Sequence, residues 1–264
     1  MHQFDHDIAV SAGGDACQAQ VTPRWSVNEN PDGGYLMAMA ANALLEKSEK
    51  KWPAIITANF IVRCQPAAVR IVPVHMGRSR TFDRWQAVLT QEDSEKIRVL
   101  GTFIDRTEDA GDKRYELAPP SIPPPEECVG FPQLPGYTIF DQMDVRLDPA
   151  CAGWFTGASL AERSEHKGWI RFREERDFDP LGIILAADAF PPAVLASQGM
   201  VAWVPTIEMT VNVRNCPQSP WLKGLFRSSF INNGLAEEDG QLWDETGELI
   251  AISRQITLFR KIGS

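Results

Sequence analysis

Few residues of this chain are of the types that mark metal sites and covalent catalysts. Its 264 residues include only four histidines and five cysteines, and neither type recurs at the spacing that metal sites use. The chain has no Gly-x-Ser-x-Gly elbow and no phosphate-binding P-loop, which excludes the standard nucleophilic hydrolases. We therefore expect a chemistry that needs neither a metal nor another cofactor.

Long apolar runs and excess positive charge are also missing. No apolar run approaches the length that crosses a bilayer, and residues 1–7 lack the basic and apolar pattern of a secretion signal. The odd number of scattered cysteines indicates free thiols, so we expect a cytoplasmic protein without membrane contact. The net charge of −9 disfavours a nucleic acid as partner, although local arginines can still bind a small anionic ligand.

What the chain does contain is one pattern that occurs twice. An Asn-Pro-Asp-Gly-Gly turn at 30–34 leads into an apolar run, and Asp179-Pro-Leu-Gly leads into a second run. Each run is followed by a strand-like segment that ends in arginine, at Arg63 and at Arg214. A period near half the chain predicts two copies of one helix-and-sheet unit, and it excludes short-repeat solenoids and propellers.

Each copy predicts one buried helix and several antiparallel strands. The first helix, from about residue 34 to 49, is apolar on nearly all sides, and Asp32 favours its start. The second helix should end or kink at Pro191-Pro192. Alternating segments predict strands at 55–63, 69–77, 81–91 and 96–104, and then at 139–146, 154–158, 168–173, 207–214, 222–231, 235–244 and 249–260.

A helix enclosed by an antiparallel sheet, repeated once, is the α+β double hotdog architecture. The proline-rich segment 116–136 divides the copies, because proline fixes φ and removes donors, and we expect it to be an extended linker. The expected units are therefore an N-terminal repeat at 1–115, the linker at 116–136 and a C-terminal repeat at 137–264.

Several short segments resemble the acyl-CoA thioesterase II family. Residues 30–36, 60–63 and 77–82 look like the first half of that family, and 207–208, 221–222, 228–229 and 252–255 resemble its second half in the correct order. The resemblance implies hydrolysis of an acyl-CoA thioester by a water that a carboxylate, a hydroxyl and a glutamine orient and activate. Carried over by position, these residues are Glu208, Ser229 and Gln255, with Ser228 as an alternative hydroxyl.

The carboxylate assignment has alternatives. The family usually has aspartate where this chain has Glu208, and the polar residues of segment 205–213 also suit a strand that simply faces solvent. Asp188 is the alternative carboxylate, because an acid on the apolar background of the second helix is costly unless it is paired or protonated. A structural role for Asp188, hydrogen-bonded to the other copy, is the favoured interpretation.

The start of the first helix supplies candidates for the oxyanion site. Backbone N–H groups of Gly33, Gly34 and Tyr35 can stabilise a developing oxyanion, although such glycines also form simple turns. This arrangement predicts one site per chain, with the base from the second copy. The resemblance implies acyl-CoA as the substrate, and Arg78 and Arg80 could contact its phosphates unless they are merely solvated.

Two other functions remain open at this point. The same scaffold could bind an acyl-CoA or a lipid without turning it over. Hotdog folds also include acyl-thioester hydratases and dehydratases, but these need a histidine paired with an acid near the helix, and neither predicted helix contains a histidine. Hotdog sheets often extend across subunits, so a homo-oligomer is compatible with the sequence.

Overall fold

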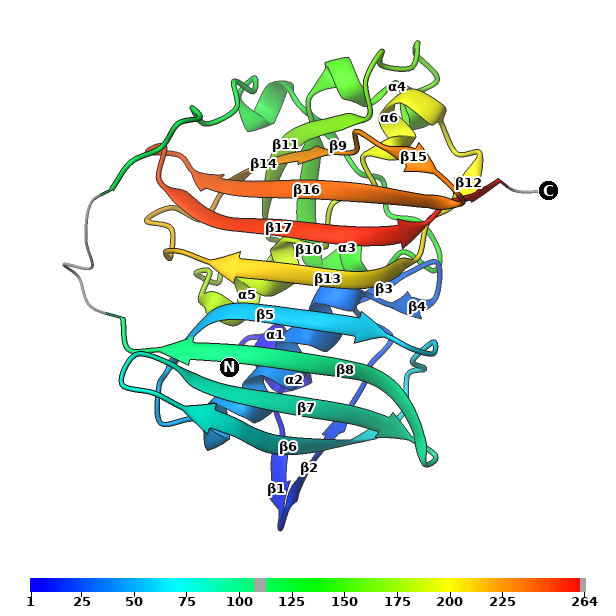
Figure 1. The fold of residues 1–264 in the computed structure, drawn as a ribbon. Helices are drawn as coiled ribbons and strands as arrows, with labels where there is room; N and C mark the ends of the chain where they lie inside the picture. Colours follow the sequence, from blue (N-terminus) through cyan, green and yellow to red (C-terminus); the bar gives the residue numbers. More distant parts are fainter. Residues whose placement is uncertain (107–112, 262–264) are drawn as a thin grey trace.

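The computed structural model describes residues 1–106 and 113–261, and its main feature is one continuous antiparallel sheet of 14 strands (Figure 1). The strand order is β1-β2-β6-β7-β8-β5-β13-β17-β16-β14-β11-β10-β9, and β15 pairs with β16 outside this path. Every pairing is antiparallel, and β5 pairs with β13 where the two halves meet. The predicted α+β architecture of two fused helix-and-sheet units is therefore confirmed.

The strands of the first half are β1 (Ser11–Gly13), β2 (Ala16–Gln20), β5 (Trp52–Phe60), β6 (Ala68–Arg78), β7 (Asp83–Gln91) and β8 (Ser94–Ile104). Those of the second half are β9 (Val129–Gly130), β10 (Met143–Leu147), β11 (Glu165–Phe172), β13 (Thr206–Val213), β14 (Leu222–Arg227), β15 (Ile231–Asn232), β16 (Leu235–Asp244) and β17 (Leu249–Leu258). Two short pairs lie outside this sheet, β3 (Ser26–Val27) with β4 (Asn30–Pro31) and β12 (Ala202–Trp203) with β18 (Arg260–Lys261).

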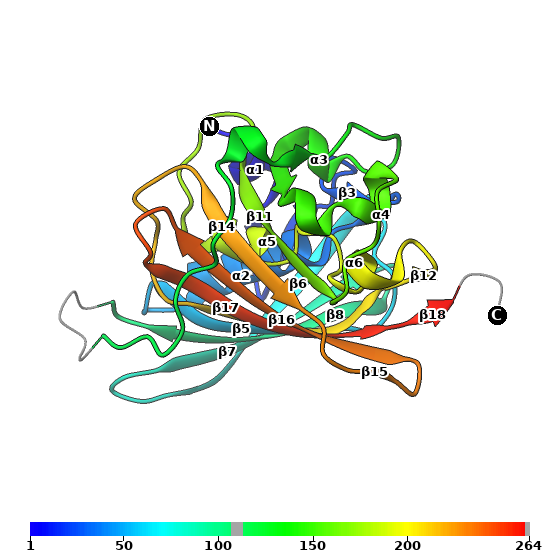
Figure 2. The same cartoon turned by 90° about the horizontal axis from the view of Figure 1, so that it is seen from above.

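The helices lie on the concave side of the curved sheet (Figure 2). They are α1 (Gln3–Asp7), α2 (Gly33–Lys47), α3 (Ile139–Gln142), α4 (Gly153–Thr156), α5 (Pro180–Ala186) and α6 (Val194–Gln198), with short 3-10 turns at Pro125–Glu127 and Pro149–Cys151. Of the helices in the described residues, none is long and apolar enough to cross a bilayer.

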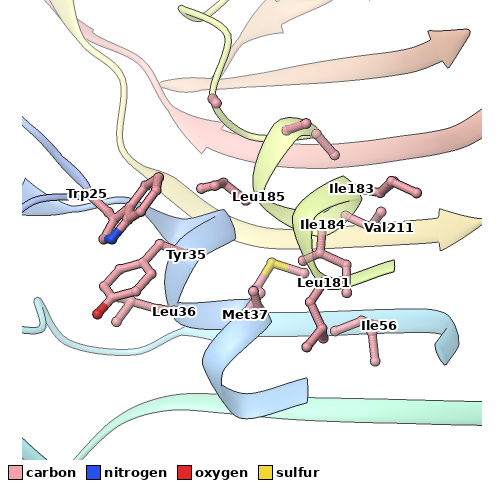
Figure 3. Close-up of a cluster of buried hydrophobic side chains, with 14 of the residues drawn as sticks. Trp25, Tyr35, Leu36, Met37, Ile56, Leu181, Ile183, Ile184, Leu185 and Val211 are labelled. Carbon is pink, nitrogen blue, oxygen red and sulfur yellow. The ribbon is translucent and has the colours of Figure 1, made fainter. Parts of the chain in front are cut away.

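Helices α2 and α5 form the centre of the core. Asp32 caps α2 by accepting a hydrogen bond from the Tyr35 N–H at 3.0 Å, and Asp179 caps α5 in the same way through the Gly182 N–H at 2.8 Å. Met37 of α2 lies beside Ile184 of α5 (Figure 3). This packing buries both helices against the strands that join the two halves, which explains why the α2 sequence is apolar on nearly all sides.

The second helix is shorter than the sequence suggests. We expect it to reach the prolines, but α5 ends at Ala186, and the chain then runs irregularly until α6 begins at Val194. Pro191 cannot donate to the carbonyl four residues earlier and its ring clashes there, so it ends the helix upstream of itself. The irregular segment 187–193, which we call the α5–α6 segment, contributes to the candidate site.

Four other predictions are wrong in detail, and one of them is the strand at 222–231, because β14 ends at Arg227 and β15 begins only at Ile231. Segment 154–158 is not a strand, because α4 occupies Gly153–Thr156 and ends at Gly157, whose φ of 79° is in the left-handed region. Segment 139–146 begins as helix α3 and becomes strand β10 only at Met143. The linker 116–136 is not wholly extended, since β9 within it pairs with β10 at the edge of the sheet. Runs this short cannot be assigned by periodicity alone.

Candidate active site

The α5–α6 segment places Asp188 against the first turn of α2. The Gly34 N–H donates a hydrogen bond of 2.8 Å to Asp188 Oδ2. A Cβ atom on Gly33 would lie 2.7 Å from that same oxygen and 2.8 Å from Phe60 Cζ, and one on Gly34 would lie 2.9 Å from Asp188 Cβ. The two glycines are therefore needed because the acid of the second half occupies the space that side chains would take.

Burial at this helix start changes the acidity of two carboxyl groups. Desolvation raises the pKa of Asp188 to about 6, although the N–H groups of Gly34 and Gly33 oppose the shift. Desolvation, followed by the nearby negative charge of Asp188, raises the pKa of Asp32 well above its ordinary value. Asp188 is thus a carboxylate that gains and loses its proton close to neutral pH, which is the range a general base requires.

A second polar cluster lies on the inner face of the sheet. The Thr206 hydroxyl donates to Gln255 Oε1 at 2.6 Å, and Gln255 Nε2 donates to Glu238 Oε1 at 2.8 Å. The other oxygen of Glu238 accepts a hydrogen bond of 2.5 Å from the Ala193 N–H. Gln255 and Glu238 are directly opposite each other on β17 and β16, and both are buried.

The polar cluster adjoins Asp188. The α5–α6 segment carries both Asp188 and Ala193, and Ala193 binds Glu238 directly. Burial raises the pKa of Glu238 to about 7, with a further contribution from the negative charge of Asp188. Figure 1 shows β3 and β4, which precede α2, at the end of the sheet where β13 begins and β17 ends. One region therefore gathers two carboxyl groups, a hydroxyl and an amide.

His166 binds the α5–α6 segment at Pro191. Its ring nitrogen Nδ1 lies 3.0 Å from the Pro191 carbonyl oxygen, which can only accept, so this nitrogen carries the hydrogen. Burial lowers the pKa of His166 to about 4, and the ring is therefore neutral. No group of three His, Cys, Asp or Glu side chains in residues 1–106 and 113–261 converges as a metal site.

Glu208 lies on the outer face of the sheet, away from Gln255. In an antiparallel pair, opposite residues share a face and successive residues alternate, and Gln255 is opposite the buried Met209 rather than Glu208. An irregularity in the pairing after Thr206 turns both Ile207 and Glu208 outward, so Ile207 does not share the face of Met209 as expected. The structure therefore does not bring Glu208 together with Gln255, with which it was expected to orient a water.

Ser229 is not beside Gln255 either. It is exposed between β14 and β15, where its N–H donates to Glu237 Oε1 at 2.8 Å. Glu237 and Glu238 are successive residues of β16 and point to opposite faces of the sheet. Because Ser229 binds Glu237, it lies on the outer face, opposite to Glu238. The Ser228 N–H donates to the Ser164 carbonyl instead. The hydroxyl that reaches Gln255 comes from Thr206, which precedes the strand predicted from residue 207.

The other predicted site residues have mixed outcomes. Tyr35 is structural, because its N–H binds Asp32 and its buried hydroxyl donates to the Asp7 carbonyl at 3.1 Å. The Gly34 N–H binds Asp188, so it is not a free donor for an oxyanion. Arg78 pairs with Glu49 and with Asp83, the carboxylate that accepts the Ser48 hydroxyl.

The ion pairs of Arg78 with Glu49 and Asp83 lie far from Asp188. Ser48 is the C-cap of α2, whose 15 residues span about 22 Å, so Arg78 lies at the end of the helix opposite Gly33. Arg80 is exposed in the turn that follows β6. Neither arginine belongs to the region around Asp188, and the prediction of a phosphate contact gains no support from their positions.

Comparisons with known proteins give a consistent result. Residues 21–104 match the family model of the acyl-CoA thioesterase N-terminal domain, and residues 125–259 match that of the acyl-CoA thioesterase C-terminal domain. An uncharacterized protein of Mycobacterium tuberculosis is 23% identical over 277 residues, which cover 93% of this chain and 92% of that protein.

Two solved structures are similar along their whole length. A protein assigned as a thioesterase II from Thermobifida fusca has a TM-score of 0.90 at 24% identity, covering 99% of this chain and 98% of its own. A protein with a hot dog fold from Alicyclobacillus acidocaldarius has a TM-score of 0.89 at 21% identity, covering 99% of each chain. These similarities confirm the double hotdog fold.

Proposed function

The chain belongs to the acyl-CoA thioesterase family, and from that premise we propose that it hydrolyses an acyl-CoA thioester to the free acid and coenzyme A. The observation that carries the proposal is Asp188, which is held at the start of α2 and whose charge acts on Glu238, a member of the cluster in which Thr206 donates to Gln255. Attack by water needs a base, groups that orient the water and a favourable environment for the developing negative charge. This region offers all three.

In the proposed reaction, Asp188 accepts one proton of a water molecule while the water oxygen attacks the thioester carbon. Thr206 uses its own hydrogen to bind Gln255, so its oxygen is free to accept the second hydrogen of that water. The tetrahedral intermediate expels the thiolate of coenzyme A, and the proton held by Asp188 passes to the sulfur. Asp188 then returns to its ionised form.

The start of α2 stabilises the negative charge that develops on the thioester oxygen. The helix dipole makes this end of a helix electrostatically positive, even though the N–H groups of Gly34 and Tyr35 already bind Asp188 and Asp32. Gly33 and Gly34 remain in the proposal as part of this environment, and their lack of side chains lets a substrate approach closely. Asp32 caps the same turn and keeps its N–H groups in place.

A hydratase or dehydratase is less well supported. The histidine–acid contact at His75 and Asp83 lies near the C-terminal end of α2, and Asp83 also accepts the Ser48 hydroxyl and the Trp85 indole N–H. His166 donates to a backbone carbonyl, not to a carboxylate. His6 contacts Asp7 and His2 lies near Glu174, and none of the four histidines, all within the described residues, has a hydrogen bond or ion pair to Asp188. The region around Asp188 therefore lacks the pair that such chemistry needs.

The test is free-thiol release from a panel of acyl-CoAs of graded chain length. We expect Asp188→Asn to lower kcat by about 10²- to 10⁴-fold, because a neutral amide cannot accept the proton. Glu208→Gln is the control, since it removes an exposed carboxylate on the outer face. Loss of activity in Glu208→Gln with full activity in Asp188→Asn would return the base to Glu208. Saturable acyl-CoA binding without thiol release by the wild type would make this a binding protein.

A further inference from the structure

Glu238 is a buried carboxyl group for which the water attack has no direct use. Its exposed fraction is 4%, and its side chain contacts the amide of Gln255 and the N–H of Ala193. None of the ion pairs among the described residues includes Glu238, so its charge is not balanced by a cation. Burying an unbalanced acid opposes folding, and such groups concentrate at functional sites.

The position of Glu238 determines how Gln255 is oriented. A glutamine amide has nearly the same shape in its two flipped orientations, but its oxygen only accepts and its nitrogen only donates. With Nε2 toward Glu238, the oxygen faces Thr206 and must receive the threonine hydrogen. The flipped amide would instead turn its nitrogen toward Thr206 and its oxygen toward Glu238.

The charge of Glu238 selects between these orientations. An ionised carboxylate repels the amide oxygen and accepts only from Nε2, which leaves the Thr206 oxygen free to accept from water. A protonated Glu238 can donate to the amide oxygen of a flipped Gln255. In that orientation Gln255 Nε2 donates a hydrogen bond to the Thr206 oxygen. The threonine would then offer its hydrogen to the water and no longer fix it for proton transfer to Asp188.

We propose that Glu238 is a positioning residue that sets the direction of the hydrogen bonds from Thr206 through Gln255, and thereby the orientation of the attacking water. The proposal rests on the thioesterase function proposed above. Glu238 does not touch the substrate, and its effect on the reaction passes through Gln255.

The surroundings of Glu238 make its charge sensitive to neutral pH. The charged groups that act on it are both acids, Asp188 from the α5–α6 segment and Glu237 from its own strand. The groups hydrogen-bonded to it, the amide of Gln255 on β17 and the N–H of Ala193, are neutral. Burial is the larger cause and raises the pKa of Glu238 to about 7. The ionised form therefore gains as pH rises through this value, and activity should rise with it.

The kinetic test uses Glu238→Gln with Glu237→Gln as the matched control. Glutamine at 238 must keep its oxygen on Ala193, so its nitrogen faces Gln255 and holds the amide in the flipped orientation. We expect kcat to fall about 10- to 100-fold with little change in KM, and the inflection of the pH profile near 7 to disappear. Glu237→Gln removes a charge on the outer face that is the smallest cause of the raised Glu238 pKa, so it should keep the wild-type kcat and retain the inflection at a slightly lower pH. Wild-type kcat and pH profile in Glu238→Gln would overturn the proposal.

A second measurement does not depend on turnover. The side-chain amide resonance of Gln255, assigned by NMR through a Gln255→Asn variant, should titrate near pH 7 in the wild type and in Glu237→Gln. It should not titrate there in Glu238→Gln. A Gln255 resonance that stays constant from pH 5.5 to 8.5 in the wild type would refute the coupling. A protein that titrates as expected but releases no thiol would refute the thioesterase function and leave the coupling intact.

Discussion

The two halves of this protein use the same architecture but differ along one row of the sheet. Reading across the inner face through directly paired residues, the row runs from the first half into the second as Ala87, Val99, Ala58, Met209, Gln255 and Glu238. All six are buried, yet only the last two are polar. The first half uses this level of the sheet for packing, and the second half uses it for the candidate site.

The central helices show the complementary difference. α2 is an unbroken helix of 15 residues, and its start supplies N–H groups and two glycines. α5 has seven residues, and the prolines that end it release a segment that reaches back to α2 with Asp188 and to the sheet with Ala193. One half thus supplies a rigid helix end, and the other supplies the acid bound to it.

Adding one side chain at each helix start tests whether the starts of α2 and α5 differ in function. Gly33→Val should lower kcat by more than about 100-fold, because its Cβ would displace the carboxylate of Asp188. Gly182→Ala is the counterpart at the start of α5, where the added Cβ meets Arg176 and Phe172. It should lower the melting temperature but leave kcat within a few-fold of wild type. Normal turnover by a folded Gly33→Val protein would contradict the role of this helix start.

Thr206 and Thr210 of β13 lie on opposite faces of the sheet, and their variants test whether only the inner face takes part in the reaction. Thr206→Val should lower kcat about 10- to 100-fold, since the water loses an acceptor and Gln255 loses its donor. Thr210→Val removes a hydroxyl that binds Thr57 at 2.9 Å where the halves join, and it should change kcat less than twofold. Steady-state kinetics of both variants tests this expectation. Equal losses of kcat in the two variants would contradict the role assigned to the Thr206 hydroxyl.

Ionisation of Asp188 should raise activity and lower the stability of the folded protein. Its raised pKa of about 6 means that the base is ionised, and kcat/KM rises, as pH increases through 6. The folded state binds this proton more tightly than the unfolded state, so the same group makes the protein less stable as pH rises from about 4 to 6. Kinetics and denaturant titrations over pH 4.5 to 7.5, repeated with Asp188→Asn, should show that the variant loses the activity rise through pH 6 and part of the stability decrease. The raised pKa values of Asp32 and Glu238 account for the part that remains.

The smallest effect is expected at the far end of α2. Arg78 is exposed and pairs with Glu49 and Asp83, so Arg78→Ala should lower the melting temperature only slightly. Its KM for acyl-CoA should change less than twofold. A large increase in KM, together with a weaker dependence on salt, would restore Arg78 as a contact for the phosphates of coenzyme A.

Local patterns in the sequence were sufficient for much of the fold. The strand from Leu235 to Asp244 begins and ends where its alternation predicts, and the start of α2 follows from the capping acid Asp32. The same alternation could have identified Glu238, which falls on the buried face between Ala236 and Gly240. Alternation also puts Glu208 on the face opposite Met209, as the structure does, and only the family resemblance gave it a catalytic role. The irregular pairing after Thr206, which turns Ile207 outward, cannot be inferred from alternation.

The sequence by itself determined that the chain is a duplicated helix-and-sheet unit, because periodicity, caps and turns act over a few residues and leave direct signatures. Only the tertiary structure decided which polar residues meet. Asp188 and Gly34 are 154 positions apart in the chain, and Thr206 and Gln255 are 49 apart. Their contacts depend on the register between strands and on the path of the α5–α6 segment, and both are set by how the two halves pack together rather than by any local pattern.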